Sequence, residues 1–198
     1  MKLIMVRHGE SDHNVNDLVQ GHTPSKLTPK GKFQAKSVAN FLKTENINKI
    51  YSSDLTRAKE TAEIINESFN KDLQFFKVLR ERSFGDYENG SFEDFHKAVA
   101  ESNKKYHQFK PKNGESCEEK GEKMMEFINQ ISKENEKNTV LIVTHGGNIL
   151  EVLFRGLNLS RENYKEYNPR NCAVTILELG ANGKFVKNII NKCPWSGE

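Results

Sequence analysis

Thr139-Val140-Leu141-Ile142-Val143-Thr144 is the stretch of sequence that decides the fold. Residues 140–143 form an unbroken apolar run between two threonines, without the alternation of a half-exposed strand. Such a run is typical of a central strand in a parallel sheet, which helices cover on both faces. His145-Gly146-Gly147 follows directly and ends the apolar run. The sequence therefore predicts a buried central strand with a histidine at its carboxyl end.

Five further segments predict strands around this one. They are apolar stretches bounded by turn residues, and several are rich in β-branched and aromatic side chains. These predicted strands span residues 2–7, 49–52, 74–79, 173–178 and 185–191. The last two flank Gly180-Ala181-Asn182-Gly183, whose turn chemistry predicts a hairpin connection.

Helices are predicted between the strands from their capping residues. Thr28-Pro29 joins an N-cap residue to a proline at the first helical position, and predicts a helix to about residue 43. Asp54 is the expected N-cap of a second helix, and Ser116 with Glu119 forms a capping box ahead of a third. This alternation predicts an α/β fold, a three-layer α/β/α sandwich with a mainly parallel central sheet and an antiparallel edge strand.

Composition narrows the class of protein. The chain has 198 residues, of which 35% are hydrophobic and 29% charged, and we expect a single domain over residues 1–198. No apolar run approaches the roughly 20 residues of a membrane span, and we expect no secretory signal at the start of the chain. The net charge of +3 comes from interleaved lysines and glutamates rather than a basic stripe. We therefore expect neither a membrane nor a nucleic acid as a partner.

The number and spacing of the cysteines and histidines favour a reducing compartment and disfavour a metal site. Cys117, Cys172 and Cys193 are few, odd in number and far apart, so they form neither a disulfide framework nor a Cys-x-x-Cys site. The histidines do not have the spacing of metal ligands, and nothing resembles His-Glu-x-x-His. We expect a cytoplasmic protein without a metal or another cofactor.

Residues 86–113 are the most polar and least patterned part of the chain, with four aromatic residues among many charges. This stretch predicts a lid-like excursion over the edge of the sheet. Oligomeric state is left open, with a homodimer through a sheet edge or through this excursion as one option.

Polar side chains follow four of the predicted strands where each strand ends. Arg7-His8, Ser53-Asp54, Arg80-Glu81-Arg82 and His145-Gly146-Gly147 occupy these positions. In open α/β sheets, ligands bind beyond the carboxyl ends of the strands. The predicted fold would therefore bring these side chains together.

The first of these strand ends combines residues suited to attack on phosphorus. Arg7 can hold a phosphate, His8 can act as the nucleophile, and Gly9 lets the backbone come close. Arg57, in the first turn of a predicted helix, adds its positive charge to a helix N-terminus, which is typical of an anion site. Asn14 and Gln20-Gly21 supply side-chain amides and loop N–H groups.

Six motifs, taken together and in their order, resemble the histidine phosphatase superfamily, in its phosphoglycerate mutase-like branch. The resemblance extends from residue 2 to about residue 177. The motifs are Arg7-His8-Gly9-Glu10-Ser11, Leu27-Thr28-Pro29-Lys30-Gly31, Tyr51-Ser52-Ser53-Asp54-Leu55-Thr56-Arg57-Ala58, Leu79-Arg80-Glu81-Arg82, Gly114-Glu115-Ser116 and Thr144-His145-Gly146-Gly147.

The resemblance implies a role for each candidate residue. His8 would carry the phosphoryl group as a phosphohistidine, and Glu81 would act as general acid and then as general base. The phosphate oxygens would be held by Arg7, Arg57, His145, Asn14, Gln20 and the backbone amides of Gly21 and Gly146. Arg82 would suit a second anionic group of the substrate, such as a carboxylate. Structural interpretations remain open, because Arg57 could be a helix-surface arginine and residues 80–82 an exposed ion-paired cluster.

Three functions fit this set of residues. The first is a metal-independent phosphatase of a small phosphorylated metabolite, such as phosphoserine or a sugar or glycerate phosphate. The second is a phosphoglycerate mutase. In the mutases of this family, the stretch between the motifs of Glu81 and Gly114 is much longer. The short stretch here favours hydrolysis, because it leaves a phosphohistidine more open to water. The third is an inactive phosphate-binding module, which the presence of both His8 and Glu81 disfavours.

Overall fold

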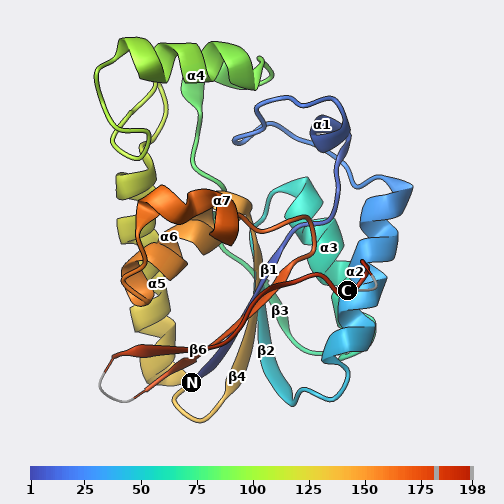
Figure 1. Ribbon diagram of the computed structural model, residues 1–198. Helices are drawn as coiled ribbons and strands as arrows, with labels where there is room; N and C mark the ends of the chain where they lie inside the picture. The colour runs from blue at the N-terminus through green and yellow to red at the C-terminus, as the bar shows by residue number, and fades with distance from the viewer. Residues whose placement is uncertain (181–182, 197–198) are drawn as a thin grey trace.

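A computed structural model describes residues 1–180 and 183–196. A six-stranded sheet forms its centre, with the strand order β3-β2-β4-β1-β5-β6 (Figure 1). The predicted hairpin turn at residues 180–183 lies partly outside the described residues. The strands are β1 (Lys2–Arg7), β2 (Ile47–Ser52), β3 (Leu73–Phe75), β4 (Thr139–Thr144), β5 (Val174–Leu179) and β6 (Phe185–Lys192).

The sheet has the predicted mainly parallel character, with antiparallel pairing at one side. β4 lies between β2 and β1 and is parallel to both, and β3 is parallel to β2. β5 pairs antiparallel with β1 and with β6, so β5 runs against the other strands. The parallel register aligns Arg7 with Thr144. The residues that follow these two strands, His8 and His145, therefore emerge at the same level of the sheet.

Helices cover both faces of the sheet (Figure 1). The helix α2 packs with α3 on one face, and α5 packs with α6 on the other. The α-helices are α1 (Asp12–Val15), α2 (Pro29–Leu42), α3 (Thr56–Asn66), α4 (Phe92–Glu101), α5 (Cys117–Glu134), α6 (Gly146–Gly156) and α7 (Tyr164–Tyr167). Short 3-10 helices are η1 (Lys77–Leu79), η2 (Gly85–Tyr87) and η3 (Arg161–Asn163). No helix of the described residues is both long and apolar enough to cross a membrane.

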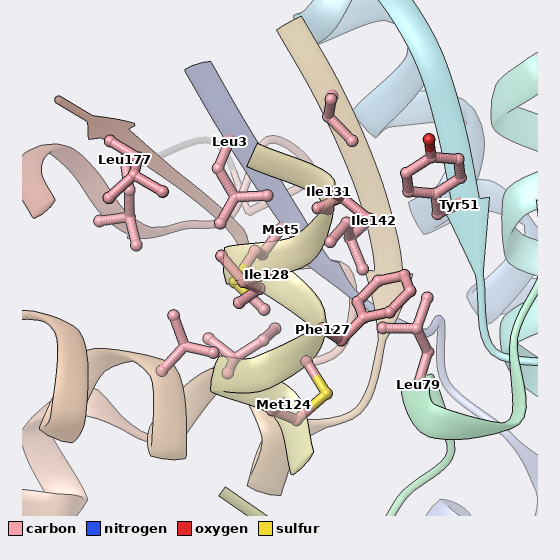
Figure 2. Close-up of a cluster of buried hydrophobic side chains, with 14 of the residues drawn as sticks. Leu3, Met5, Tyr51, Leu79, Met124, Phe127, Ile128, Ile131, Ile142 and Leu177 are labelled. Atoms are coloured by element: carbon pink, nitrogen blue, oxygen red, sulfur yellow. The ribbon is translucent and has the colours of Figure 1, made fainter. Parts of the chain in front are cut away.

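The central strands are buried on both faces, as their unbroken apolar runs predict. Val140 and Ile142 of β4 belong to the cluster under α5 and α6, whereas Leu141 and Val143 belong to the cluster under α2 and α3. Figure 2 shows the first cluster, in which side chains of α5 point toward the strands. Alternation of side chains along a strand divides such a run between two cores.

The capping predictions have mixed outcomes. Thr28 caps α2, with its hydroxyl accepting from the N–H of Gly31 at 3.0 Å, and the capping box before α5 is present. The prediction for Asp54 is wrong, because the N-cap of α3 is Leu55. The Asp54 carboxylate instead accepts two hydrogen bonds from Arg80, each at 2.6 Å. Arg80 gives the carboxylate two charge-assisted bonds to a full positive charge, whereas a cap gives one bond to a backbone N–H, which explains this choice of partner.

Strand β3 is shorter than predicted. It ends at Phe75, and the predicted strand residues 77–79 form η1 instead. The turn brings the Leu79 side chain into the core, where it is 0% exposed. Lys120 of α5 donates to the Val78 carbonyl at 2.6 Å, so the chain pairs there with a side chain rather than with a strand.

The predicted excursion carries α4 and packs on residues outside it in a small apolar cluster. The buried members of this cluster are Phe95 of α4 and, from outside the excursion, Val19 and Phe84. Figure 1 shows α4 at the end of the molecule toward which β1 and β4 run. The excursion thus lies beyond the carboxyl ends of the strands. Its movement as a lid stays a prediction.

Candidate active site

Two buried histidines form the centre of the site. His8 follows β1 and is 3% exposed, and His145 follows β4 and is 0% exposed. Their ring centroids are 5.2 Å apart, and the rings are tilted by 58°. The backbone N–H of His8 donates to the Thr144 carbonyl at 2.9 Å, which extends the register of the two strands by one residue.

Hydrogen bonds determine the tautomer of His8. Its Nδ1 lies 2.8 Å from the Gly9 carbonyl oxygen, which can only accept, so Nδ1 carries the proton. Arg57 Nε donates toward His8 Nε2 at 3.3 Å, so Nε2 presents a lone pair. Burial, followed by the charges of Arg57 and Arg7, holds the pKa of His8 well below its ordinary value of 6.5. His8 is therefore a neutral imidazole near neutral pH, with its lone pair on Nε2, facing Arg57.

Arg57 is buried beneath a loop instead of lying on the helix surface. It begins in the first turn of α3 and is 1% exposed. Its Nη2 donates to the Gly21 carbonyl at 2.8 Å, and its Nη1 donates to the Thr23 carbonyl at 3.2 Å. Burial lowers the pKa of Arg57 to about 10, so the guanidinium remains charged at neutral pH. A fixed positive charge thus lies against the nucleophilic nitrogen of His8.

Two buried polar atoms near His8 have no hydrogen-bond partner within the described part of the chain. They are Arg7 Nε and His145 Nδ1. Arg7 also donates from Nη1 to the Pro169 carbonyl at 2.7 Å, which fixes its guanidinium. Buried polar atoms are rarely left unpaired in native proteins. An oxyanion bound beside the two histidines would accept from the Arg7 Nε–H, and phosphate binding at this position stays a prediction.

Gly146, in the first turn of α6, lies beside Arg7. A Cβ atom there would be 3.6 Å from Arg7 Cδ and Nε, an ordinary van der Waals contact, so the position does not require glycine. A helix N-terminus adds its own partial positive charge to an anion site.

Glu81 is held by two backbone N–H groups. Its Oε1 accepts from Arg82 N at 2.9 Å, and its Oε2 accepts from Gly147 N at 3.0 Å. A Cβ atom at Gly147 would lie 2.5 Å from Glu81 Oε1, so the carboxylate needs glycine there. These contacts bring Glu81 to the N-terminus of α6, next to His145, although Glu81 follows η1 and not the end of a strand.

Asn14 and Gln20 occupy the loop side of the site. Asn14 Oδ1 accepts from Ser11 N and from Asn171 Nδ2, each at 3.1 Å. Gln20 Oε1 accepts from the Ser25 hydroxyl at 3.0 Å. Both amide oxygens are thus occupied, which leaves the amide nitrogens as the groups to offer a ligand. The structure shows a different contact at Gly21, whose carbonyl accepts from Arg57.

Arg82 is buried against an aromatic cluster, next to Glu81 in the chain. It is 3% exposed, and its guanidinium carbon is 4.2 Å from the Phe84 ring centroid and 5.1 Å from that of Tyr106. Its Nη2 also bonds the Tyr106 hydroxyl at 3.1 Å. The guanidinium therefore stabilises the aromatic cluster under α4. Its predicted contact with a second anionic group of the substrate stays a prediction.

Sequence reasoning missed two residues that support the nucleophile. Thr61 Oγ1 accepts from Gly9 N at 3.0 Å, and so holds the backbone of the residue whose carbonyl accepts from His8. Asn171 donates to the His8 carbonyl at 3.1 Å. Thr61 lies four residues after Arg57, on the same helix face, and this spacing could have identified it. Asn171 comes from the loop before β5, and no sequence pattern singles it out.

Histidine burial predicts a pH-dependent stability. The unfolded chain binds protons on His8 and His145 below their ordinary pKa of 6.5, whereas burial keeps both neutral in the folded state. The free energy of unfolding should therefore fall as the pH falls below about 6.5, by about 1.4 kcal/mol for each histidine at about pH 5.5. Urea unfolding between about pH 7.5 and 5.5, in a buffer without phosphate, measures this change.

The control for this prediction is His96→Asn, which removes an exposed histidine of α4. We expect His96→Asn to keep the pH dependence of the wild type and His8→Asn to reduce it. An equal pH dependence in wild type and His8→Asn would contradict the assignment of His8 as a buried neutral group.

No group of three or more His, Cys, Asp or Glu side chains within the described ranges is arranged to hold a metal ion. The positive charge at the phosphate position comes from Arg7 and Arg57.

Comparisons with known proteins agree with this geometry. A family model described as the histidine phosphatase superfamily (branch 1) matches residues 3–192. The adenosylcobalamin/α-ribazole phosphatase of Salmonella typhimurium is 27% identical, and the match covers 100% of both chains. The metal-independent phosphoserine phosphatase of Arabidopsis thaliana is 30% identical over 78% of this chain and 68% of that protein. The crystal structure of an Entamoeba histolytica phosphoserine phosphatase with 3-phosphoglyceric acid has a TM-score of 0.84 at 30% identity, covering 96% of each chain.

Proposed function

The chain belongs to the histidine phosphatase superfamily (branch 1), and from this we propose that it is a metal-independent phosphatase of small phosphomonoesters. The observation that carries the proposal is the state of His8. Its Nδ1 proton is bound to the Gly9 carbonyl, and its Nε2 lone pair lies beside Arg57. A neutral nitrogen nucleophile next to a fixed positive charge suits attack on a phosphoryl group.

In the first step, His8 Nε2 forms a bond to phosphorus while the bond from phosphorus to the leaving oxygen breaks. Glu81 gives its proton to that oxygen, so an alcohol leaves and a phosphohistidine remains. Arg7 and Arg57 stabilise the charge on the other phosphoryl oxygens, and Asn14 with Gln20 adds amide donors. Positioning and electrostatic stabilisation supply most of the catalysis in such transfers.

In the second step, water attacks the phosphohistidine. Glu81 accepts a proton from the water as the new oxygen–phosphorus bond forms and the nitrogen–phosphorus bond breaks. Inorganic phosphate leaves, and His8 returns to its neutral state with the Nε2 lone pair. One carboxyl group thus serves as acid and then as base, because the first step leaves it deprotonated.

The alternative of a phosphoglycerate mutase differs only in the fate of the phosphohistidine. A mutase must keep water out until the group returns to a substrate. The stretch between Glu81 and Gly114 is short, which supports hydrolysis. For the substrate we propose phosphoserine or a sugar or glycerate phosphate, and the phosphoserine phosphatases among the relatives support the first of these.

A panel of phosphomonoesters, assayed in the presence of a chelator, tests this function. We expect phosphate release from at least one of phosphoserine, 3-phosphoglycerate and the sugar phosphates, with no loss of rate in the chelator. The Arg7 and Arg57 guanidiniums already supply the positive charge that a metal would bring.

A mutase assay run in parallel separates the two enzymes. Interconversion of phosphoglycerates that exceeds phosphate release would contradict the hydrolase assignment and favour the mutase. Binding of phosphate without any turnover would favour an inactive binding module.

A further inference from the structure

Ser53 is a buried residue at the end of β2 to which the proposed mechanism gives no role. It is 0% exposed and directly precedes the pair Asp54 and Leu55 that leads into α3. Its hydroxyl oxygen lies 2.9 Å from His145 Nε2. The same oxygen accepts from Leu55 N at 3.2 Å. Ser53 therefore connects the start of α3, which carries Arg57, to the second histidine of the site.

The available donors and acceptors decide which partner donates in the hydrogen bond between Ser53 and His145. The Ser53 hydroxyl has one proton, and the Leu55 N–H already points at its oxygen. Within the described part of the chain, His145 Nε2 is the acceptor within reach of that proton. When Ser53 donates to Nε2, this nitrogen must carry the lone pair. A neutral His145 then carries its proton on Nδ1.

The opposite tautomer would leave two groups unsatisfied. A protonated Nε2 would donate to Ser53, and the buried serine proton would have no acceptor among the described residues. The lone pair would then lie on Nδ1, the buried atom without a partner. A lone pair at that position repels a phosphoryl oxygen, whereas an N–H attracts it. Leaving buried polar groups without a partner costs free energy, so this tautomer is disfavoured.

His145 also stays neutral. Burial, followed by the charges of Arg57, His8, Lys120 and Arg7, holds its pKa well below 6.5. A neutral histidine has one donor nitrogen, and the group that hydrogen-bonds to the ring selects which nitrogen that is. Ser53 is the group that hydrogen-bonds to the His145 ring, at Nε2.

We propose, on the basis of the phosphatase function above, that Ser53 is a positioning residue that holds His145 in its Nδ1–H tautomer. His145 then donates from Nδ1 to a phosphoryl oxygen. His8 has the same tautomer, set by the Gly9 carbonyl, but presents its Nε2 lone pair to phosphorus. The two histidines have the same tautomer but different roles. At His8 the Gly9 carbonyl occupies Nδ1, so the Nε2 lone pair faces the substrate, and at His145 Ser53 occupies Nε2, so the Nδ1–H faces it.

Nitrogen-15 NMR of histidine-labelled protein tests the tautomer directly, without substrate. The His145 signals are identified by their loss in His145→Asn. We expect the wild type to show a protonated Nδ1 and an unprotonated Nε2 at His145. A protonated Nε2 would overturn the proposal. This spectrum is independent of turnover, so it separates failure of this inference from failure of the proposed function.

Ser53→Ala removes the hydroxyl, and Ser52→Ala is its matched control. Ser52 is also 0% exposed at the end of β2, but its hydroxyl donates to the carbonyls of Ser53 and Ala58 and has no contact with His145. We expect Ser53→Ala to mix the two tautomers of His145 and to weaken binding of inorganic phosphate. Its kcat/KM should fall by roughly 10–100-fold, the range found when hydrogen-bond partners of metal-ligating histidines are removed.

Ser52→Ala should leave the His145 spectrum unchanged, and Ser53→Thr should keep the wild-type tautomer because it retains the hydroxyl. An unchanged His145 tautomer in Ser53→Ala would overturn the proposal. An equal change in Ser52→Ala would do the same, because it would show a general effect of altering the buried strand end. If Ser53→Ala does not fold, the wild-type spectrum still decides.

Discussion

His8→Asn is expected to lower kcat by roughly 10⁴-fold or more. The change removes Nε2, the atom that forms the bond to phosphorus. Asparagine keeps a side-chain N–H at the position of Nδ1, so it can still donate to the Gly9 carbonyl. The fold should therefore persist while the reaction loses its nucleophile. Phosphate release from the best substrate of the panel measures the loss.

Acid-quench labelling with a substrate that carries a radioactive phosphoryl group tests the same prediction, because it traps the phosphohistidine intermediate. Wild-type protein should carry the label in an acid-labile, base-stable linkage on His8, and His8→Asn should carry none. His13→Asn is the control, because His13 on α1 contacts Asp12 and Asn89 away from His8. Label on a serine or an aspartate, or full turnover by His8→Asn, would refute the phosphohistidine mechanism.

Glu81→Gln is expected to lower kcat by about 10²–10⁴-fold for an alkyl phosphate such as phosphoserine. Glutamine has nearly the same shape, and its amide oxygen can still accept one of the two N–H groups that hold the carboxylate. It cannot give a proton to the leaving oxygen. Steady-state rates on phosphoserine, with Glu126→Gln on the exposed face of α5 as the control, measure the loss.

The leaving group distinguishes proton transfer from a purely structural role of Glu81. p-Nitrophenolate leaves without protonation, so Glu81→Gln should form the phosphohistidine from p-nitrophenyl phosphate at a rate near that of the wild type. Its second step still lacks a base, so a burst of p-nitrophenol should precede slow turnover. An equal loss in the first step for both substrates would show that Glu81 orients the site and does not protonate the leaving group.

Much of the fold follows from local pattern. The apolar run at residues 139–144 predicts β4 with its bounds, and Thr28-Pro29 predicts the start of α2. Both signals depend on neighbours in the chain, through alternation of side chains or through a cap. The prediction fails at Asp54, whose partner Arg80 lies 26 residues away. A cap preference of about 1 kcal/mol cannot compete with a bidentate ion pair that only the folded chain brings together.

The candidate site divides in the same way. Arg7, His8, Glu81 and His145 could be chosen from the sequence because each follows a predicted strand, and parallel strands end at one edge of a sheet. Arg82 follows the same predicted strand as Glu81, but its guanidinium lies among the rings of Phe84, Phe95 and Tyr106. Successive residues of an extended segment point in opposite directions, so adjacent positions separate into the site and the aromatic cluster.

The sequence by itself determined which chemical groups this protein has and at which end of its sheet they emerge. It could not determine their protonation. The tertiary structure decided that His8 keeps its lone pair on Nε2 and that Ser53 lies against Nε2 of His145. The physical reason is that a histidine tautomer depends on which partner each nitrogen meets. Those partners, a neighbouring carbonyl in one case and a serine 92 residues away in the other, take their places only when the strands pair.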